Sequence, residues 1–290
     1  MNTQISSDKS TIFSEKKSLN CAGKLINFET PVIMGVLNIT PDSFYDGGKN
    51  NSAKAYLQHT ALMLQEGAAI IDIGAASTRP GAKIINADEE LENLLPALKN
   101  IRKEFPEAII SIDTYHSKVA EIVVDNGADI INDISGGAFD ADMFAAIGKL
   151  KVPYVLMHTQ GTPETMQKSP VYDNVLKEVI FYFSEKINTL RSLGVNDIII
   201  DPGFGFGKTV EHNYKLLSGL SLFKMFELPI LAGVSRKSMI NKVLNCKPED
   251  ALNGTTVLNT IALMKGASIL RVHDVKEAME VVKLVRHLGV

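Results

Sequence analysis

Eight short runs rich in valine, isoleucine and leucine recur along the chain, and this recurrence constrains the fold more than any other feature. Several runs are almost continuously apolar, such as Ile-Ile-Asp-Ile over 70–73. Such runs are typical of strands buried on both faces of a parallel sheet. The predicted strands are Val32–Asn38, Ala69–Gly74, Ala108–Asp113, Asp129–Ile134, Tyr154–His158, Asp197–Asp201, Pro229–Val234 and Ser268–Val272.

Longer stretches with helical spacing separate these runs. Asp88-Glu89-Glu90 opens one of them, and acidic residues complement the dipole at a helix start. Gly67, Gly127 and Gly266 each follow such a stretch, where a C′ glycine is typical. The predicted helices are Ser52–Glu66, Asp88–Phe105, Ser117–Asn126, Asn174–Leu193, Val210–Leu217, Lys237–Leu244, Pro248–Lys265 and Val275–Leu288.

Eight strand–helix units in 290 residues indicate an α/β fold of the (β/α)8, or TIM, barrel type, which takes about 250 residues. The alternative is a doubly wound open sheet, which usually carries GxGxxG after its first strand. Here the first strand is followed by Ile-Thr-Pro-Asp-Ser-Phe instead. We therefore expect one barrel over 31–290, preceded by a polar arm over 1–30 that is either a short hairpin or disordered.

Composition excludes several classes of function. Hydrophobic residues make up 45% of the chain, which argues against wholesale disorder, and a formal net charge of −3 argues against nucleic acid as a main partner. No apolar run reaches about 18 residues, and the first twenty residues lack the apolar core of a signal peptide. The two cysteines are too few for a disulfide framework. These features predict a cytoplasmic protein without a membrane partner.

Polar residues end nearly every predicted strand. In (β/α)8 barrels the carboxyl ends of the strands form the active site, and buried polar groups are costly unless they are paired. Asp113, Asn132 and Asp201 supply acceptors and an amide, which suit the edge of a heterocycle that carries N–H groups. The remaining strand ends supply Asn38, Asp72, Asp133 and His158.

A second group of strand ends is cationic or can become so. Lys237, Arg271 and His273 suit an anion, and an arginine can hold a phosphate bidentately. Arg271 and His273 are two residues apart, so on a strand they face the same side. A planar polar heterocycle joined to a phosphate group would satisfy both groups of residues.

The segment Ser235-Arg236-Lys237-Ser238 enters a predicted helix. Free N–H groups at a helix start favour an anion, so a second substrate that bears a carboxylate could bind there. Ser238 could equally be a simple N-cap.

One segment resembles a phosphate-binding P-loop. Residues 202–209 fit GxxxxGK[ST] except that Pro202 replaces the first glycine. We favour a flexible barrel loop in which Phe204 or Phe206 presents an aromatic wall. No zinc-type histidine spacing and no GxSxG elbow occurs, whereas Mg²⁺ held on substrate phosphates would need only one or two protein oxygens, such as that of Asn38.

Taken in order, the strand ends resemble those of the dihydropteroate synthase family. The most specific motifs are Asn-Ile-Thr-Pro-Asp-Ser-Phe over 38–44 and Ser-Thr-Arg-Pro-Gly over 77–81. The resemblance runs from about Pro31 to the end of the chain. The matching segments are Met34–Gly48, Asp72–Gly81, Ser111–Thr114, Ile131–Gly137, Met157–Pro163, Asp201–Lys208, Gly233–Ser238 and Arg271–Val275.

The resemblance implies a transferase of folate biosynthesis, usually a homodimer, that uses Mg²⁺ and is a sulfonamide target. It would join 6-hydroxymethyl-7,8-dihydropterin diphosphate to 4-aminobenzoate, giving 7,8-dihydropteroate and diphosphate. Pterin-binding positions would be Asp113, Asn132, Met157, Asp201 and Lys237. Diphosphate-binding positions would be Asn38, which also helps to hold Mg²⁺, Thr78, Arg271 and His273. Aminobenzoate-binding positions would be Phe44, Thr78, Arg79, Pro80, Phe206 and Ser238, and catalytic positions Arg271, His273, Lys237 and Asp46.

The chain departs from the family pattern at four positions. Ala75 and Ala76 stand where Gly-Glu is common, and Thr159 and Glu164 replace residues that are often Met and Arg. These changes bear on loop ordering rather than on the reaction. Two alternatives stay open: a pterin-binding barrel that transfers methyl groups, and a paralogue that binds pterin without turnover. The intact Ser-Thr-Arg-Pro-Gly loop argues against both.

Overall fold

The structure is a computed structural model that describes residues 16, 18–39, 49–76, 85–162, 165–166 and 170–288, with 49–52 described by their backbone alone. Eight parallel strands are hydrogen-bonded in the order β8-β7-β6-β5-β4-β3-β10-β9, and a bridge between Ile200 and Ile230 joins the two ends of the sheet. This arrangement confirms the predicted (β/α)8 barrel. The strands are β3 (Val32–Asn38), β4 (Ile70–Gly74), β5 (Ile109–Asp113), β6 (Ile130–Asp133), β7 (Tyr154–Met157), β8 (Ile198–Asp201), β9 (Leu231–Ala232) and β10 (Ile269–Val272).

The strand β9 is much shorter than the predicted run Pro229–Val234. Proline has no N–H to donate to a neighbouring strand, so pairing cannot be regular at Pro229. Only Leu231 and Ala232 pair with β10, and Ile230 contributes the bridge to Ile200. The barrel is therefore closed by its shortest strand.

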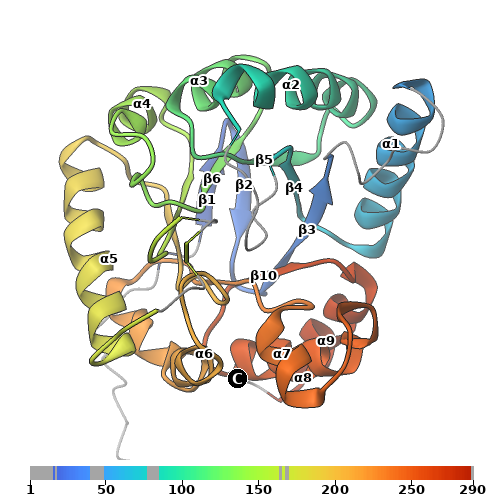
Figure 1. Cartoon of the computed structure of the whole chain (residues 1–290). Helices are drawn as coiled ribbons and strands as arrows, with labels where there is room; N and C mark the ends of the chain where they lie inside the picture. Colours follow the sequence, from blue (N-terminus) through green and yellow to red (C-terminus); the bar gives the residue numbers. More distant parts are fainter. Residues whose placement is uncertain are drawn as a thin grey trace, which may run out of the picture.

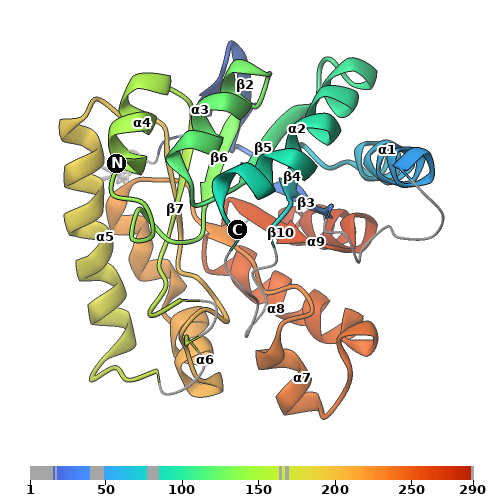
Figure 2. The same ribbon diagram turned by 45° about the horizontal axis from the view of Figure 1, so that its top comes forward.

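Helices surround the strands on the outside of the barrel, with α5 and α1 on opposite sides in both views (Figures 1 and 2). The α-helices are α1 (Lys49–Glu66), α2 (Ala87–Glu104), α3 (Ser117–Asp125), α4 (Met143–Leu150), α5 (Val175–Ser192), α6 (Val210–Ser218), α7 (Ser238–Leu244), α8 (Leu252–Met264) and α9 (Val275–Arg286). The 3₁₀-helices are η2 (Leu220–Phe226) and η3 (Pro248–Asp250). None of the described helices is long and apolar enough to cross a membrane.

The sequence analysis missed α4. Its eight residues include Gly148, which in a sequence favours a loop. The glycine is there for packing, because a Cβ at this position would lie 2.9 Å from the carbonyl oxygen of Leu193. The short helix therefore approaches the end of α5 more closely than any residue with a side chain would allow.

A β-hairpin closes the amino-terminal end of the barrel. Strands β1 (Ser18–Cys21) and β2 (Lys24–Asn27) pair antiparallel across a turn at Ala22-Gly23, whose residues both have positive φ. Such two-residue turns match the twist of a hairpin. Leu19, Cys21 and Ile26 are buried against side chains inside the barrel, including Met34 and Ile130. Because the hairpin covers the amino-terminal end of the barrel, we expect a functional site at the carboxyl ends of the strands.

Candidate functional site at the carboxyl ends of the strands

Side chains from four strands meet in one hydrogen-bonded network at the carboxyl end of the barrel. The guanidinium of Arg271 on β10 donates from Nε to Asp72 Oδ2 at 2.7 Å and from a terminal nitrogen to Asp113 Oδ2 at 3.0 Å. Asn132 Nδ2 donates to the same Asp72 oxygen at 3.1 Å. Parallel strands with aligned ends bring these residues together although up to 199 positions separate them in the chain.

Asp72 is the centre of this network; the sequence analysis counted it among the polar strand ends but assigned it no ligand. Its side chain is fully buried, and its Oδ1 has no hydrogen-bond partner among the described residues. The signal in the sequence was a single acidic residue inside an otherwise apolar strand. A fully buried carboxylate needs a cation or several donors, and Arg271 and Asn132 meet that need here.

Burial shifts the protonation of the acceptors in the site. Desolvation raises the pKa of Asp113 to about 7, although the Arg271 charge opposes the shift. Desolvation also raises the pKa of Asp201, against the charge of Lys237. Asp113 can therefore exchange a proton with a bound ligand near neutral pH more readily than an exposed carboxyl can.

Lys237 approaches the site from the loop after β9. Its Nζ donates to the carbonyl oxygen of Phe204 and lies 4.8 Å from the centre of the Phe206 ring. Burial lowers its pKa to about 8, while the Asp201 carboxylate acts in the opposite direction. Lys237 thus joins the acceptor side of the site to the aromatic loop after β8.

An apolar wall stands beside the polar network. Met157, Tyr115 and Ile134 form a buried cluster, and Phe206 and Ala76 pack against it. Met157, expected at the pterin, and Phe206, expected at the aminobenzoate, are therefore parts of one surface. Phe204 is fully buried, so of the two loop phenylalanines only the half-buried Phe206 can present its ring to a ligand.

His273 and Ser235 form the other edge of the site. Ser235 Oγ lies 3.0 Å from His273 Nδ1 and accepts a hydrogen bond from the His273 backbone N–H. The His273 side chain is exposed, yet desolvation by the surrounding protein and the Arg271 charge lower its pKa. We therefore expect a neutral imidazole at pH 7, rather than the cation considered from the sequence.

Arg236, next to Lys237, points away from the site. Its guanidinium donates two hydrogen bonds to Asp274, and its backbone has a φ of +55°, which is unusual for a residue other than glycine. Its backbone N–H donates to Thr255 Oγ1 at 3.0 Å. These contacts explain the turn that directs Lys237 into the site and Arg236 out of it.

Two further predicted residues lie at the rim. Asn38 ends β3 with an exposed side chain, and Ser238 is the exposed first residue of α7 rather than its N-cap, which is Lys237. The described residues contain no group of three or more His, Cys, Asp or Glu side chains that could hold a metal ion. A lone amide oxygen suits only a hard cation that brings its other ligands with it, as Mg²⁺ on a diphosphate does.

Two residues expected in the polar ring face elsewhere. Asp133 accepts hydrogen bonds from Tyr154 Oη and from the N–H groups of Ser135 and Gly137, and His158 is bonded through Nδ1 to Lys208. Side chains alternate along a strand, so the residue beside an inward-facing one points outward. Phe44, Asp46, Thr78, Arg79, Pro80 and Glu164 lie outside the described residues.

Comparison with known proteins decides the family. The profile of the family described as "Pterin binding enzyme" matches residues 34–273. Dihydropteroate synthase of Escherichia coli K12 is 45% identical over 265 residues, covering 91% of this chain and 93% of that protein. The chain belongs to the dihydropteroate synthase family.

Solved structures agree with this assignment. Yersinia pestis dihydropteroate synthase in a sulfonamide drug complex superposes with a TM-score of 0.88 at 41% identity, covering 94% of this chain and 99% of that one. Xanthomonas albilineans dihydropteroate synthase with 4-aminobenzoic acid has a TM-score of 0.88 at 34% identity, covering 94% and 98%. The same enzyme in complex with 7,8-dihydropteroate has a TM-score of 0.82 at 29% identity, covering 94% and 99%.

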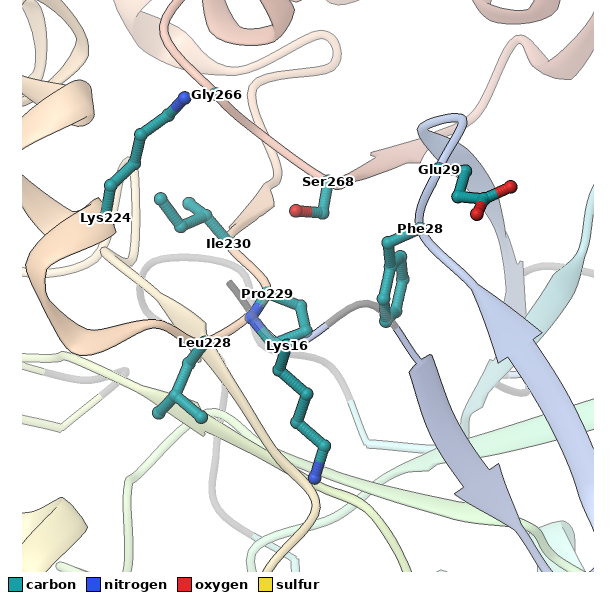
Figure 3. Close-up of a pocket in the computed structure, with 9 residues that line it drawn as sticks. All are labelled: Lys16, Phe28, Glu29, Lys224, Leu228, Pro229, Ile230, Gly266 and Ser268. Atoms are coloured by element: carbon teal, nitrogen blue, oxygen red, sulfur yellow. The ribbon is translucent and has the colours of Figure 1, made fainter. Parts of the chain in front are cut away.

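A cavity of about 280 Å³ lies at the opposite end of this synthase-family barrel. Figure 3 shows Lys16, Phe28, Pro229 and Ser268 among its lining residues. Ser268 and Pro229 precede β10 and β9, so the cavity is at the amino ends of the strands. In barrel enzymes that end contributes stability rather than chemistry, and we place the site at the network around Asp72.

Proposed function

We propose that this chain is a dihydropteroate synthase that joins 6-hydroxymethyl-7,8-dihydropterin diphosphate to 4-aminobenzoate. The observation that carries the proposal is the network at the carboxyl end of the barrel in which Asp72 and Asp113 accept hydrogen bonds from the Arg271 guanidinium and Asn132 donates to Asp72. It combines acceptors for a heterocycle with a cation for its phosphate group. The complexes of the Xanthomonas enzyme with 4-aminobenzoic acid and with 7,8-dihydropteroate support the same reaction.

The pterin would lie against Asp113, Asn132, Asp201 and Lys237, with Met157 beneath it. Amide and amidine-like N–H groups of the ring suit the carboxylates, and Asn132 can both donate and accept. Asp72 is a further candidate, because its Oδ1 is buried without a partner among the described residues. Burial of these groups makes each hydrogen bond to the pterin electrostatically stronger than it would be in water.

The diphosphate would leave toward Arg271 and His273. The C–O bond of the pterin methylene breaks, and its electron pair departs with the diphosphate. Arg271 stabilises the negative charge, and the neutral His273 can donate a hydrogen bond. We propose that the Asn38 amide oxygen would help to hold a Mg²⁺ ion bound to the diphosphate. When bound, the ion would neutralise part of the leaving-group charge.

The amine of 4-aminobenzoate would then form the new C–N bond and lose one proton. Phe206 and Lys237 would border its ring, and the exposed Ser238 would meet its carboxylate. Thr78, Arg79, Pro80, Phe44 and Asp46 are proposed to complete the site on the basis of the family motifs. Exclusion of water protects the electrophilic methylene from hydrolysis, and no protein nucleophile is required.

We also propose a homodimer in the cytoplasm. Exposed apolar side chains stand on two helices that contact each other, Val243 and Leu244 on α7 and Val257 and Met264 on α8. Large exposed apolar side chains on adjoining helices favour association. Both cysteines are free thiols, which suits a reducing compartment. Sedimentation equilibrium would test the dimer, and a monomer at micromolar concentration would contradict it.

The decisive experiment measures diphosphate release from the pterin substrate with Mg²⁺, in the presence and absence of 4-aminobenzoate. We expect release that depends on the amine, with dihydropteroate as the product. Titration of the metal in the wild type and in Asn38→Ala tests the magnesium proposal, since the variant should need more Mg²⁺ for half-maximal rate. Tight pterin binding without turnover would instead support a binding protein.

A further inference from the structure

Lys208 is a buried lysine whose amino group is bonded within the protein, and desolvation lowers its pKa to about 7. Its side chain is 2% exposed, and its Nζ contacts the carbonyl oxygens of Gly203 and Phe206 at 3.0 Å and that of His158 at 3.2 Å. A fourth contact of 2.9 Å joins Nζ to His158 Nδ1. An ammonium group has three donors and no acceptor. These acceptors therefore occupy it fully, and it is not presented to a phosphate as the lysine of a P-loop is.

The loop over residues 203–207, whose carbonyl oxygens contact Lys208, packs closely against neighbouring backbone. Gly203, Gly205 and Gly207 all have positive φ, between +59° and +84°. A Cβ at Gly203 would lie 1.9 Å from the His158 carbonyl oxygen, and one at Gly207 would lie 2.3 Å from that of Gln160. Gly203 and Gly207 thus let the loop pack directly against the chain that follows β7, whereas Gly205 faces the Lys237 side chain.

Carbonyls of this loop point to two different lysines. Gly203 and Phe206 direct their oxygens to Lys208, whereas the intervening Phe204 directs its oxygen to Lys237. The Phe206 ring, in turn, lies under the Lys237 ammonium. The positions of Phe206 and Lys237 therefore depend on the conformation of this loop. Lys208 stabilises that conformation through its hydrogen bonds to the Gly203 and Phe206 carbonyl oxygens.

His158 completes the tie as an acceptor. Burial, followed by the Lys208 charge, lowers the pKa of its imidazole to about 2, so the ring is neutral and Nδ1 can accept from Lys208. The ring packs edge-on against Tyr182 at 4.9 Å between centres. Tyr182 Oη donates to the carbonyl oxygen of Met157, the last residue of β7, at 3.0 Å. The loop is thereby anchored to the barrel wall.

We propose that Lys208 is a positioning residue for the second substrate, holding residues 203–207 so that Phe206 and Lys237 form one wall of the amine subsite. The assignment of that subsite to 4-aminobenzoate rests on the proposed function. The pterin acceptors Asp113 and Asn132 stand on strands of the barrel. Loosening the loop should therefore affect the amine more than the pterin.

The first test separates the two Michaelis constants in Lys208→Met, which keeps the apolar stem and removes the donors. We expect KM for 4-aminobenzoate to rise roughly ten-fold or more, because small displacements of positioning groups have large kinetic effects. KM for the pterin diphosphate should change less than about three-fold. Lys215→Met, at an exposed lysine of α6, is the matched control and should leave both constants unchanged. Equal rises in both constants for Lys208→Met, or no rise, would overturn the proposal.

A second pair of variants keeps the proposal testable if Lys208→Met does not fold. In His158→Asn an amide oxygen can take the place of Nδ1 as acceptor, whereas His158→Leu has no acceptor. We expect the leucine variant to show the selective rise in KM for 4-aminobenzoate and the asparagine variant to restore most of the wild-type value. Equal behaviour of the two variants would contradict the role of this hydrogen bond.

Hydrogen exchange gives a readout that does not depend on catalysis. The N–H groups of Gly203, Gly205 and Phe206 are hydrogen-bonded in the loop. Lys208→Met should raise their exchange rates roughly ten-fold while leaving α6 unchanged, and unchanged loop protection would refute the holding role. A wild-type protein that makes no dihydropteroate would refute the proposed function, whereas the exchange result would still decide whether Lys208 holds the loop.

Discussion

The guanidinium of Arg271 is held by the carboxylate of Asp72, with 2.7 Å between Nε and Oδ2. Asp72 is fully buried on β4, whereas 21% of the Arg271 side chain is exposed. The side chain of Arg271, which is proposed to bind the diphosphate, is thus held in place by Asp72 before any ligand binds. A preorganised cation in a site of low dielectric stabilises developing charge without first having to reorient.

Replacing Asp72 by asparagine should therefore lower both stability and activity. The change leaves the partly buried guanidinium with one carboxylate partner, Asp113, instead of two, and breaking a buried pair typically costs about 3–5 kcal/mol. We expect a loss of stability of that order by urea denaturation, together with a lower kcat/KM. Asp88→Asn is the control, because Asp88 pairs with Lys118 at the exposed surface, where ion pairs contribute little. Equal stability of the two variants would show that Asp72 is dispensable.

Removal of the Arg271 guanidinium should reduce turnover more than it reduces ground-state binding. Arg271→Ala is expected to lower kcat roughly 10²-fold or more if the side chain stabilises the departing diphosphate. Arg271→Lys keeps a positive charge but cannot bond Asp72 and Asp113 with a planar fork, so it should restore only part of the rate. Single-turnover kinetics with saturating pterin substrate would measure this. A near-normal rate for the alanine variant would remove Arg271 from the chemical step.

Glu90 gives the protein a stability that depends on pH. This residue of α2 is fully buried, neither carboxyl oxygen has a hydrogen-bond partner among the described residues, and desolvation raises its pKa from 4.5 to about 8. The nearest basic group is His116, with Nε2 4.0 Å from Oε2, and Asp113 also faces it. A raised pKa means that the folded state binds the proton more tightly than the unfolded state. The resulting stabilisation is complete below about pH 4.5 and is lost as the pH rises toward 8.

Glu90→Gln should remove this dependence, because the amide cannot ionise. Between pH 6 and 8.5 we expect the wild type to lose stability relative to the variant by an amount on the order of 1 kcal/mol or more. Urea denaturation at the two pH values measures the difference. The control variant Glu89→Gln changes an exposed neighbour on the same turn, and its free energy of unfolding should depend on pH as that of the wild type does. Parallel stability curves for wild type and Glu90→Gln would show that Glu90 is not protonated in the folded protein.

The strand pattern and the family motifs predicted the barrel and most of the residues that the structure gathers at its mouth. Parallel strands buried on both faces leave a strong signal, and their carboxyl ends necessarily share one edge. The side of the sheet to which a side chain near a strand end points is harder to predict, because a shift of the strand by one position moves that side chain to the opposite side. His158 and Asp133 were placed in the polar ring for this reason, whereas the inward-facing Asp72 was placed there correctly but was assigned no ligand.

Contacts between segments far apart in the chain could not be predicted from local patterns. The tie from Lys208 to the backbone of its own loop and to His158 depends on how the β8 loop packs against the end of β7. The sequence analysis did not decide whether the amino-terminal arm forms a hairpin, because the pairing depends on the burial of Leu19, Cys21 and Ile26 against the barrel interior. Neither interaction leaves a periodic signal in the sequence.

The hairpin should stabilise the barrel without contributing to its chemistry. Leu19 is fully buried, whereas Leu25 on the paired strand is 73% exposed. Leu19→Ala should lower the free energy of unfolding by about 2–5 kcal/mol, as is typical when a buried leucine is truncated. Leu25→Ala should have little effect. Both variants should keep the wild-type kcat/KM below their unfolding temperatures, and a selective loss of activity in Leu19→Ala would place the hairpin in the catalytic machinery.

Two glycines with positive φ, Gly23 in the hairpin turn and Gly203 in the loop after β8, distinguish the cost of backbone strain from that of close packing. Gly23 and Gly203 have φ values of +93° and +71°, but a Cβ at Gly23 would have no neighbour within 4 Å, whereas one at Gly203 would lie 1.9 Å from a backbone oxygen. Gly23→Ala should therefore cost only the conformational strain, about 1–2 kcal/mol, with activity unchanged. Gly203→Ala must displace the loop from His158, so we expect a similar or larger loss of stability and, in addition, a selective rise in KM for 4-aminobenzoate. Comparable kinetics in the two variants would mean that close packing of this loop does not govern the amine subsite.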